Sequence, residues 1–126
     1  MVDPSRPLVW IGRSEKDLKR FPERVQDVFW SGLDLARRGV REIPGAKPLT
    51  RGILKGLGIL ELVEEFDGDT YRVVFTVKLT EVLAVLHAFK KKSKTGISTP
   101  RNEIRLIRVR YREAVRLHAK AARNRR

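Results

Sequence analysis

Cysteine is absent from the 126-residue sequence, and no long apolar run is present. Without cysteine the chain can form no disulfide, no thiolate zinc site and no cysteine nucleophile. No apolar run approaches the roughly 18 residues that a membrane-spanning helix needs. The N-terminal residues also lack the basic-then-apolar layout of a signal peptide. We therefore expect a cytoplasmic protein that does not act at a membrane.

Several common catalytic motifs are also missing. Gly52, Gly56 and Gly58 do not have the spacing of a dinucleotide-binding loop or a P-loop, and no Gly-x-Ser-x-Gly elbow occurs. The two histidines, His87 and His118, lie far apart and have no local carboxylate cluster, which argues against a metal site. The sequence therefore predicts neither a metal nor a cofactor, and basic side chains remain its main chemical resource.

Acidic residues become scarce towards the C-terminus, although basic residues do not. Residues 1–87 contain 14 basic and 13 acidic side chains, whereas residues 88–126 contain 14 basic side chains and only Glu103 and Glu113 as acids. The net charge of +13 is therefore concentrated in the last third. Such a basic segment attracts phosphate, so nucleic acid is the leading class of partner. Anionic lipid and a merely solvated basic tail are the alternatives.

The spacing of apolar residues predicts a single α+β domain over residues 1–118. Strands are expected at 8–11, 59–66, 71–78 and 81–89, a helix at 14–39 that Pro22 kinks or divides, a loop at 40–58, and a terminal helix that begins after Thr99-Pro100. We expect Ser14 and Thr99 to cap the helices and the basic tail at 119–126 to fray. This order, β-α(α)-β-β-β-α, predicts a small antiparallel-rich sheet packed against helices.

Basic residues can cleave RNA without a metal. The ribose 2′-OH can attack the adjacent phosphate, given a base, an acid and cations that stabilise the more negative phosphorane. Arg72 lies in the middle of a strand, where it either faces open solvent or lines a working surface. His87 is placed at the end of the third long strand and is either a packing residue or a catalyst. The lysine run starts at Lys90, three residues after His87, and falls in the same neighbourhood as His87 and Arg72 if the strands pair.

Six short segments together resemble a known family. They are Lys47-Pro48-Leu49, Leu54-Lys55-Gly56-Leu57-Gly58, Leu60-Glu61-Leu62, Tyr71-Arg72-Val73-Val74-Phe75, the segment from His87 to Lys94, and Thr99-Pro100. In this order and spacing they resemble the RelE/HigB toxins of type II toxin–antitoxin systems, and most of all the phage-derived HigB branch. The resemblance extends in element order from about residue 8 to residue 118.

The resemblance implies a RelE-like fold and a concrete activity. Such toxins are metal-independent endoribonucleases that cleave mRNA on the 70S ribosome and so inhibit translation. A cognate helix-turn-helix antitoxin neutralises them in a hetero-oligomeric complex. By this likeness Arg72 contacts the scissile phosphate, Lys91 and Lys92 lie near the basic pair at the end of the last strand, and His87 matches a histidine of that strand.

The same likeness and the charge distribution predict which other side chains bind RNA. The likeness assigns Lys47 and Lys55 to this role. The excess of basic residues adds a second group of RNA-binding candidates, namely Arg51, Lys90, Lys94, Arg101, Arg105 and Arg108.

The sequence departs from the RelE pattern in one strand. Glu61, Glu64 and Glu65 stand where that pattern has lysines. Glu61 or Glu64 is therefore either the general base or an ion-pair partner of Arg72, and pairing is the preferred interpretation. The alternative function is a non-catalytic basic protein that binds RNA or the ribosome, and a third is a degenerate toxin that retains only antitoxin binding.

Overall fold

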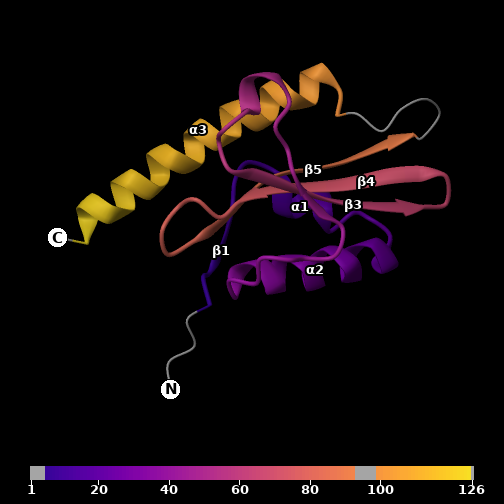
Figure 1. Ribbon diagram of the computed structural model, residues 1–126, viewed down its shortest axis with the longest axis horizontal. Helices are drawn as coiled ribbons and strands as arrows, with labels where there is room; N and C mark the ends of the chain where they lie inside the picture. The colour runs from indigo at the N-terminus through magenta and orange to yellow at the C-terminus, as the bar shows by residue number, and fades with distance from the viewer. Residues whose placement is uncertain (1–4, 93–98, 126) are drawn as a thin grey trace.

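A five-stranded sheet separates a short helical pair from one long terminal helix (Figure 1). The computed structural model describes residues 5–92 and 99–125. Its elements are β1 (Leu8–Trp10), α1 (Ser14–Leu18), α2 (Glu23–Arg37), β2 (Ala46–Pro48), the 3-10 turn η1 (Gly52–Leu54), β3 (Ile59–Phe66), β4 (Asp69–Thr76), β5 (Leu83–Lys92) and α3 (Arg101–Asn124). The predicted α+β class is confirmed.

The sheet has the strand order β1-β5-β4-β3-β2. Strands β3, β4 and β5 form the antiparallel meander that the sequence predicts. The first strand, β1, pairs in parallel with β5. After β1 the chain forms α1 and α2, which pack on one face of the sheet, before it enters the remaining strands. The expected loop at 40–58 is wrong in part, since it contains β2 and η1. Strand β2 has no apolar period of its own and is held by antiparallel pairing with β3.

The predicted helix is divided near Pro22, as expected: α1 ends at Leu18, and Pro22 is the residue that directly precedes α2. The two predicted caps are wrong. Ser14 is the first residue of α1, and its hydroxyl donates to the Val85 carbonyl oxygen at 3.1 Å. The Thr99 hydroxyl approaches Glu61 Oε2 at 3.5 Å, and Pro100 is the residue that precedes α3. Both side chains therefore join elements that are distant in sequence.

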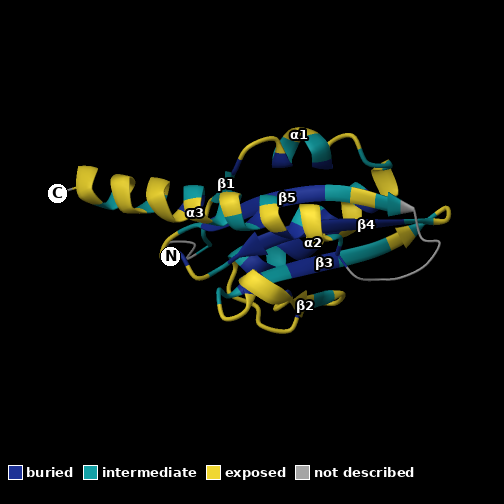
Figure 2. Ribbon diagram, turned by 90° about the horizontal axis from the view of Figure 1, so that it is seen from above, coloured by how far each residue is buried: buried dark blue, intermediate teal, exposed yellow. Residues whose placement is uncertain are grey.

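The terminal helix is longer than predicted. Residues 119–124 continue α3 and do not fray, because alanine, lysine and arginine all favour a helix. Figure 2 shows that this last part of α3 extends beyond the sheet and is largely exposed. The basic residues near the C-terminus are thus presented on a regular helix.

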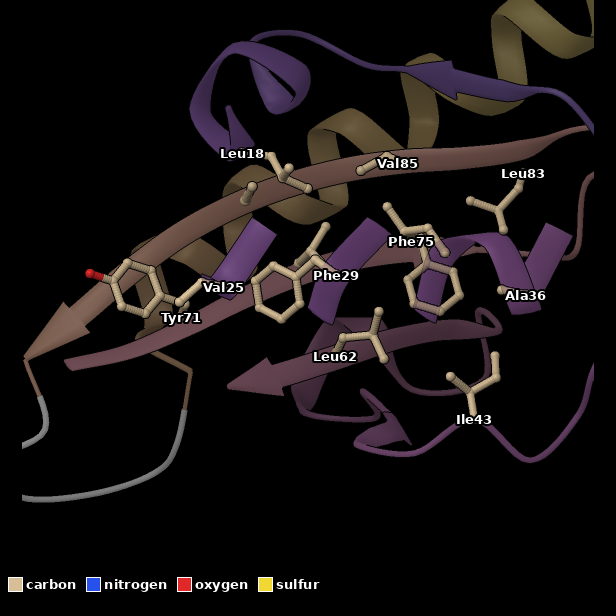
Figure 3. Close-up of a cluster of buried hydrophobic side chains, with 13 residues drawn as sticks. Leu18, Val25, Phe29, Ala36, Ile43, Leu62, Tyr71, Phe75, Leu83 and Val85 are labelled. Carbon is tan, nitrogen blue, oxygen red and sulfur yellow. The ribbon is translucent and has the colours of Figure 1, made fainter. Parts of the chain in front are cut away.

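Both faces of the sheet are covered by apolar layers. On one face, Val25 and Phe29 of α2 pack against Leu62, Phe75 and Val85 (Figure 3). On the other face α3 contributes Ile104, Ile107 and Ala114, which pack with Val74 and Leu86. Burying one such large side chain stabilises the fold by about 1.5–3 kcal/mol. Burial on both faces explains why β4 and β5 contain apolar runs, at residues 73–75 and 83–86 respectively.

Candidate functional site

The strand register places most of the predicted catalytic side chains on the face that α3 partly covers. Val74 packs beneath α3 and lies opposite Glu61 on one side and His87 on the other. Alternation along each strand then fixes the positions of the neighbours. The predicted site residues on this face are Lys47, Glu61, Arg72, His87 and Lys91, and Glu65 shares it through its pairing with Thr70. We refer to it as the α3 face of the sheet.

Lys90 lies on the opposite face. It pairs in register with Tyr71, whose ring packs in the apolar layer under α2. Its Nζ lies 3.8 Å from Asp69 Oδ2, and together with Phe21 and Tyr71 it lines a separate hollow. The lysine run is therefore divided between the two faces, and Lys90 does not join Arg72. The side chain of Lys92 and the whole of Lys94 lie outside the described residues.

Arg72 and Glu61 form a buried ion pair. Arg72 Nη1 donates to Glu61 Oε1 at 3.0 Å, and the two residues are 1% and 3% exposed. The preferred pairing of Arg72 with Glu61 is thus confirmed, but Arg72 does not face open solvent. Lys47 Nζ lies 3.7 Å from the same Glu61 oxygen and is half exposed. Glu64 lies opposite Tyr71, on the other face, and so does not join this group.

His87 is not at the end of its strand but in the middle of β5, beside a register shift in the pairing with β4. Its Nδ1 accepts a hydrogen bond from Arg110 Nη1 at 2.9 Å, and its Nε2 bonds the Glu103 carboxylate. An acceptor at Nδ1 requires the tautomer with the proton on Nε2. Burial lowers the pKa of His87, although the bond to Glu103 opposes this shift. The ring is therefore held neutral, with both nitrogens engaged.

Sequence reasoning missed Arg110 and Glu103 as partners of His87. They lie seven residues apart on α3, so both face the sheet from the same side of the helix. Arg110 Nη1 also donates to the Leu86 carbonyl oxygen at 3.1 Å. Burial lowers the pKa of Arg110 as well. The seven-residue spacing was visible in the sequence, but the register shift that brings His87 to α3 was not.

Three of the predicted RNA-binding arginines converge at the N-terminal end of α3. Arg51, Arg101 and Arg105 line a hollow of about 430 Å³ together with Gly52, Ile53 and Ile104. We call it the arginine hollow. Arg108 lies next to it, and its Nη1 donates to the Ile53 carbonyl oxygen at 3.1 Å. Lys55 follows η1, is exposed and does not line the hollow.

Residues 5–92 and 99–125 contain no group of three or more His, Asp or Glu side chains that could hold a metal ion. In the same residues, no helix is long and apolar enough to cross a membrane.

Comparison with protein families identifies the chain. The family model described as phage-derived protein Gp49-like matches residues 16–112, which is most of the sequence. The chain belongs to the Gp49-like family. This is a family of RelE-like toxins, so the RelE part of the predicted resemblance is confirmed, whereas the HigB branch remains a prediction.

The Gp49-like chain also has a structural neighbour. It is similar to a chain of the toxin–antitoxin complex RelBE2 from Mycobacterium tuberculosis, with 19% identity and a TM-score of 0.47. The similarity covers 69% of the Gp49-like chain and 99% of the other. No curated protein matches the sequence significantly. The family match includes every residue of the α3 face and of the arginine hollow.

Proposed function

We propose that this Gp49-like protein is the toxin of a toxin–antitoxin pair and that it cleaves mRNA on the ribosome without a metal ion. The toxin part rests on membership of a RelE-like family. The observation that carries the ribonuclease part is the α3 face, where Lys47, Arg72 and Lys91 share one sheet surface beside the arginine hollow. Cations gathered around one surface are what a phosphoryl-transfer transition state needs.

The proposed reaction uses the RNA as its own nucleophile. A base removes the proton of a ribose 2′-OH, and the 2′-oxygen forms a bond to the adjacent phosphorus. The bond from phosphorus to the 5′-oxygen breaks, and an acid gives that oxygen a proton. The products are a 2′,3′-cyclic phosphate and a 5′-hydroxyl end. No redox change and no added reactant are involved, so cations and proton carriers suffice.

The contacts on the α3 face suggest separate roles for its residues. Lys47 is about half exposed and can meet an incoming phosphate directly. Arg72 is enclosed, so a scissile phosphate would have to replace the Glu61 carboxylate as its partner. Lys91 pairs with Thr70, the next residue of β4 on the same face as Arg72, and it is the candidate for proton transfer on this face. Lys92 stays a candidate only through the family resemblance. His87 positions α3, because both of its nitrogens are engaged.

A second candidate function is a non-catalytic protein that binds RNA or the ribosome. The enclosure of Arg72 and the engagement of His87 favour it, since neither side chain meets solvent as a free catalytic group. The same basic surface would then serve only to bind phosphates.

Cell-free translation with primer extension separates the two functions. The wild type should produce ribosome-dependent cuts in the mRNA. Lys91→Ala should lose most of the cutting, whereas Lys90→Ala, its neighbour on the opposite face, should keep it. Both substitutions remove one lysine from the same strand, so the pair controls for net charge and for β5. Ribosome binding by the wild type without any cutting would reject the ribonuclease.

The partner in the proposed system is a helix-turn-helix antitoxin that forms a hetero-oligomer with the toxin. This proposal depends on the family assignment and on the predicted HigB-like branch. Coexpression with the protein encoded by a neighbouring short reading frame, followed by purification, would test it. Stable copurification together with restored translation is the expected result, and translation that stays inhibited would count against it.

A further inference from the structure

The arginine hollow collects positive charge without a counter-charge of its own. Arg51, Arg101 and Arg105 contribute three guanidinium groups, and none of the described residues that line the hollow is acidic. Like charges that line one hollow repel one another, and an anion bound between them offsets this repulsion. Arg101 and Arg105 are one helical turn apart, so they project from the same side of α3. The hollow is therefore suited to an anionic ligand.

Arg51 is held in place by a hydrogen bond to the backbone just before α3. Its Nη1 donates to the Thr99 carbonyl oxygen at 2.7 Å, while the Thr99 hydroxyl approaches Glu61. Glu61 is the partner of Arg72. A short chain of contacts thus links the hollow to the buried ion pair of the α3 face, with Thr99 between Arg51 and Glu61.

The floor of the hollow is apolar. Ile104 is buried, and Ile53 is 51% exposed although it is a large aliphatic residue. The guanidinium groups can bind phosphate oxygens in pairs, and the exposed isoleucine can pack against a ribose or a base. The volume lies in the range of pockets that hold small organic ligands. A nucleotide unit meets both requirements, whereas a bare anion would leave Ile53 in water.

We propose that the arginine hollow is a subsite for one flanking nucleotide of single-stranded RNA. It clamps a phosphodiester between Arg51, Arg101 and Arg105 and packs the attached ribose or base on Ile53. This subsite rests on the proposed function in that it takes the same RNA, but it concerns binding and not cleavage. It sets which phosphate along the strand reaches the α3 face.

The test measures binding of a labelled single-stranded RNA of about a dozen nucleotides by fluorescence anisotropy over a range of salt. The variant Arg101→Gln/Arg105→Gln leaves Arg51 and its bond to Thr99 unchanged. The matched control, Lys120→Gln/Arg123→Gln, removes two charges from the exposed distal part of the same helix. Thermal unfolding of all three proteins checks that each is folded.

The hollow variant should bind roughly tenfold more weakly or worse, and the control should bind nearly as well as the wild type. If Arg51 and the two substituted arginines share one phosphate, the salt slope should fall by no more than about 0.7, because Arg51 still contacts that phosphate, whereas two separate phosphates would lower it by about 1.4. Equal losses in the variant and the control would overturn the subsite, as would a slope change for two phosphates.

The apolar floor has its own test. A nucleoside monophosphate should compete with the RNA better than inorganic phosphate does, and Ile53→Ser should remove that advantage. Equal competition by the two compounds would reject the packing of a ribose or base on Ile53. Both results are independent of cleavage: failure of the ribonuclease proposal leaves the binding prediction standing, and the reverse also holds.

Discussion

Arg110 Nη1 donates a hydrogen bond to His87 Nδ1 across 2.9 Å, and the same nitrogen donates to the Leu86 carbonyl oxygen at 3.1 Å. These two bonds attach α3 to β5 at the point where the β4–β5 register shifts. Glu103 bonds the other nitrogen of the ring, so α3 contacts His87 at two positions two helical turns apart. His87 therefore fixes how α3 lies on the sheet, and with it the position of the arginine hollow.

Acid should weaken the fold through His87. Burial lowers the pKa of His87 in the folded protein below its ordinary value of 6.5, so the unfolded chain takes up the proton first as the pH falls. The free energy of unfolding should therefore decrease as the pH falls from about 6.5 to the pKa of His87 in the folded protein. Above about pH 6.5 the neutral ring should contribute its full stabilisation. Urea unfolding between about pH 7.5 and pH 5.5 measures the decrease.

His87→Gln is the control for this prediction. A glutamine can accept from Arg110 and donate to Glu103 as the neutral ring does, but it does not titrate. The wild type should lose more stability than His87→Gln over the same pH interval. If the free energy of unfolding depends on pH in the same way in both proteins, or if the wild type gains stability in acid through Glu103, the prediction that His87 is neutral in the folded protein is wrong.

Gly12 makes room for Arg110. Its φ is +58°, and a Cβ at this position would lie 2.9 Å from Arg110 Nε. Gly12→Ala should therefore destabilise the protein by about 1–2 kcal/mol through the left-handed backbone and by roughly 1 kcal/mol more through the clash. Gly39 also has a positive φ, +87°, but no described atom lies within 4 Å of its Cβ position.

Comparison of Gly12→Ala with Gly39→Ala by urea unfolding isolates the clash. The excess cost at Gly12 should disappear in an Arg110→Ala background, because the two sites are then no longer coupled. Equal costs in the wild-type background would show that Arg110 moves aside freely and does not hold α3.

Gly32 is required for a different reason. It lies inside α2, where a Cβ would stand 2.7 Å from Leu62 Cδ1. Alanine favours a helix over glycine by about 0.5–1 kcal/mol, but overpacking a core costs about 1–3 kcal/mol. Gly32→Ala should therefore lower the free energy of unfolding, and Leu62→Ala should relieve the added cost in the double variant. A stabilised Gly32→Ala would show that α2 can move away from β3.

The fold could be predicted from the sequence wherever a local pattern decides it. The long strands follow from runs of β-branched and apolar residues, and the break at Pro22 follows from a missing amide hydrogen. Strand β2 could not be predicted, because three residues at a sheet edge depend on pairing with β3. The sequence predicts too early an end for α3, because the part of the helix beyond the sheet needs only residues that favour a helix and no apolar stripe.

The contacts of the candidate site also fall into those that the sequence predicts and those that it does not. The Arg72–Glu61 pair could be predicted, since opposite charges on neighbouring strands attract each other. The partners of His87 could not, because a register shift in β5 turns its ring towards Arg110 and Glu103. The sequence predicts that Lys90 shares one neighbourhood with Arg72, which is wrong because a strand sends adjacent side chains to opposite faces. Its role in RNA binding stays a prediction.

The Arg72–Glu61 pair calls for a test that separates folding from chemistry. Arg72→Ala leaves the Glu61 carboxylate buried with Lys47, at 3.7 Å, as its remaining charged partner among the described residues, and it should cost about 3–5 kcal/mol of stability. Loss of cleavage in that variant alone would therefore be ambiguous. Replacing both members by methionine removes both buried charges and keeps the volume, so Arg72→Met/Glu61→Met should fold with a stability close to that of the wild type.

Cleavage by the double methionine variant then decides the role of Arg72. If the guanidinium leaves Glu61 to bind the scissile phosphate, the folded double variant should show at least about a hundredfold loss of mRNA cleavage in cell-free translation. Its RNA affinity should change little, because the enclosed pair adds no net charge to the surface. Glu61→Met alone keeps Arg72 but removes its carboxylate partner, and it should retain cleavage if the protein remains folded. Retained cleavage in the double variant would show that Arg72 only holds Glu61 in the sheet.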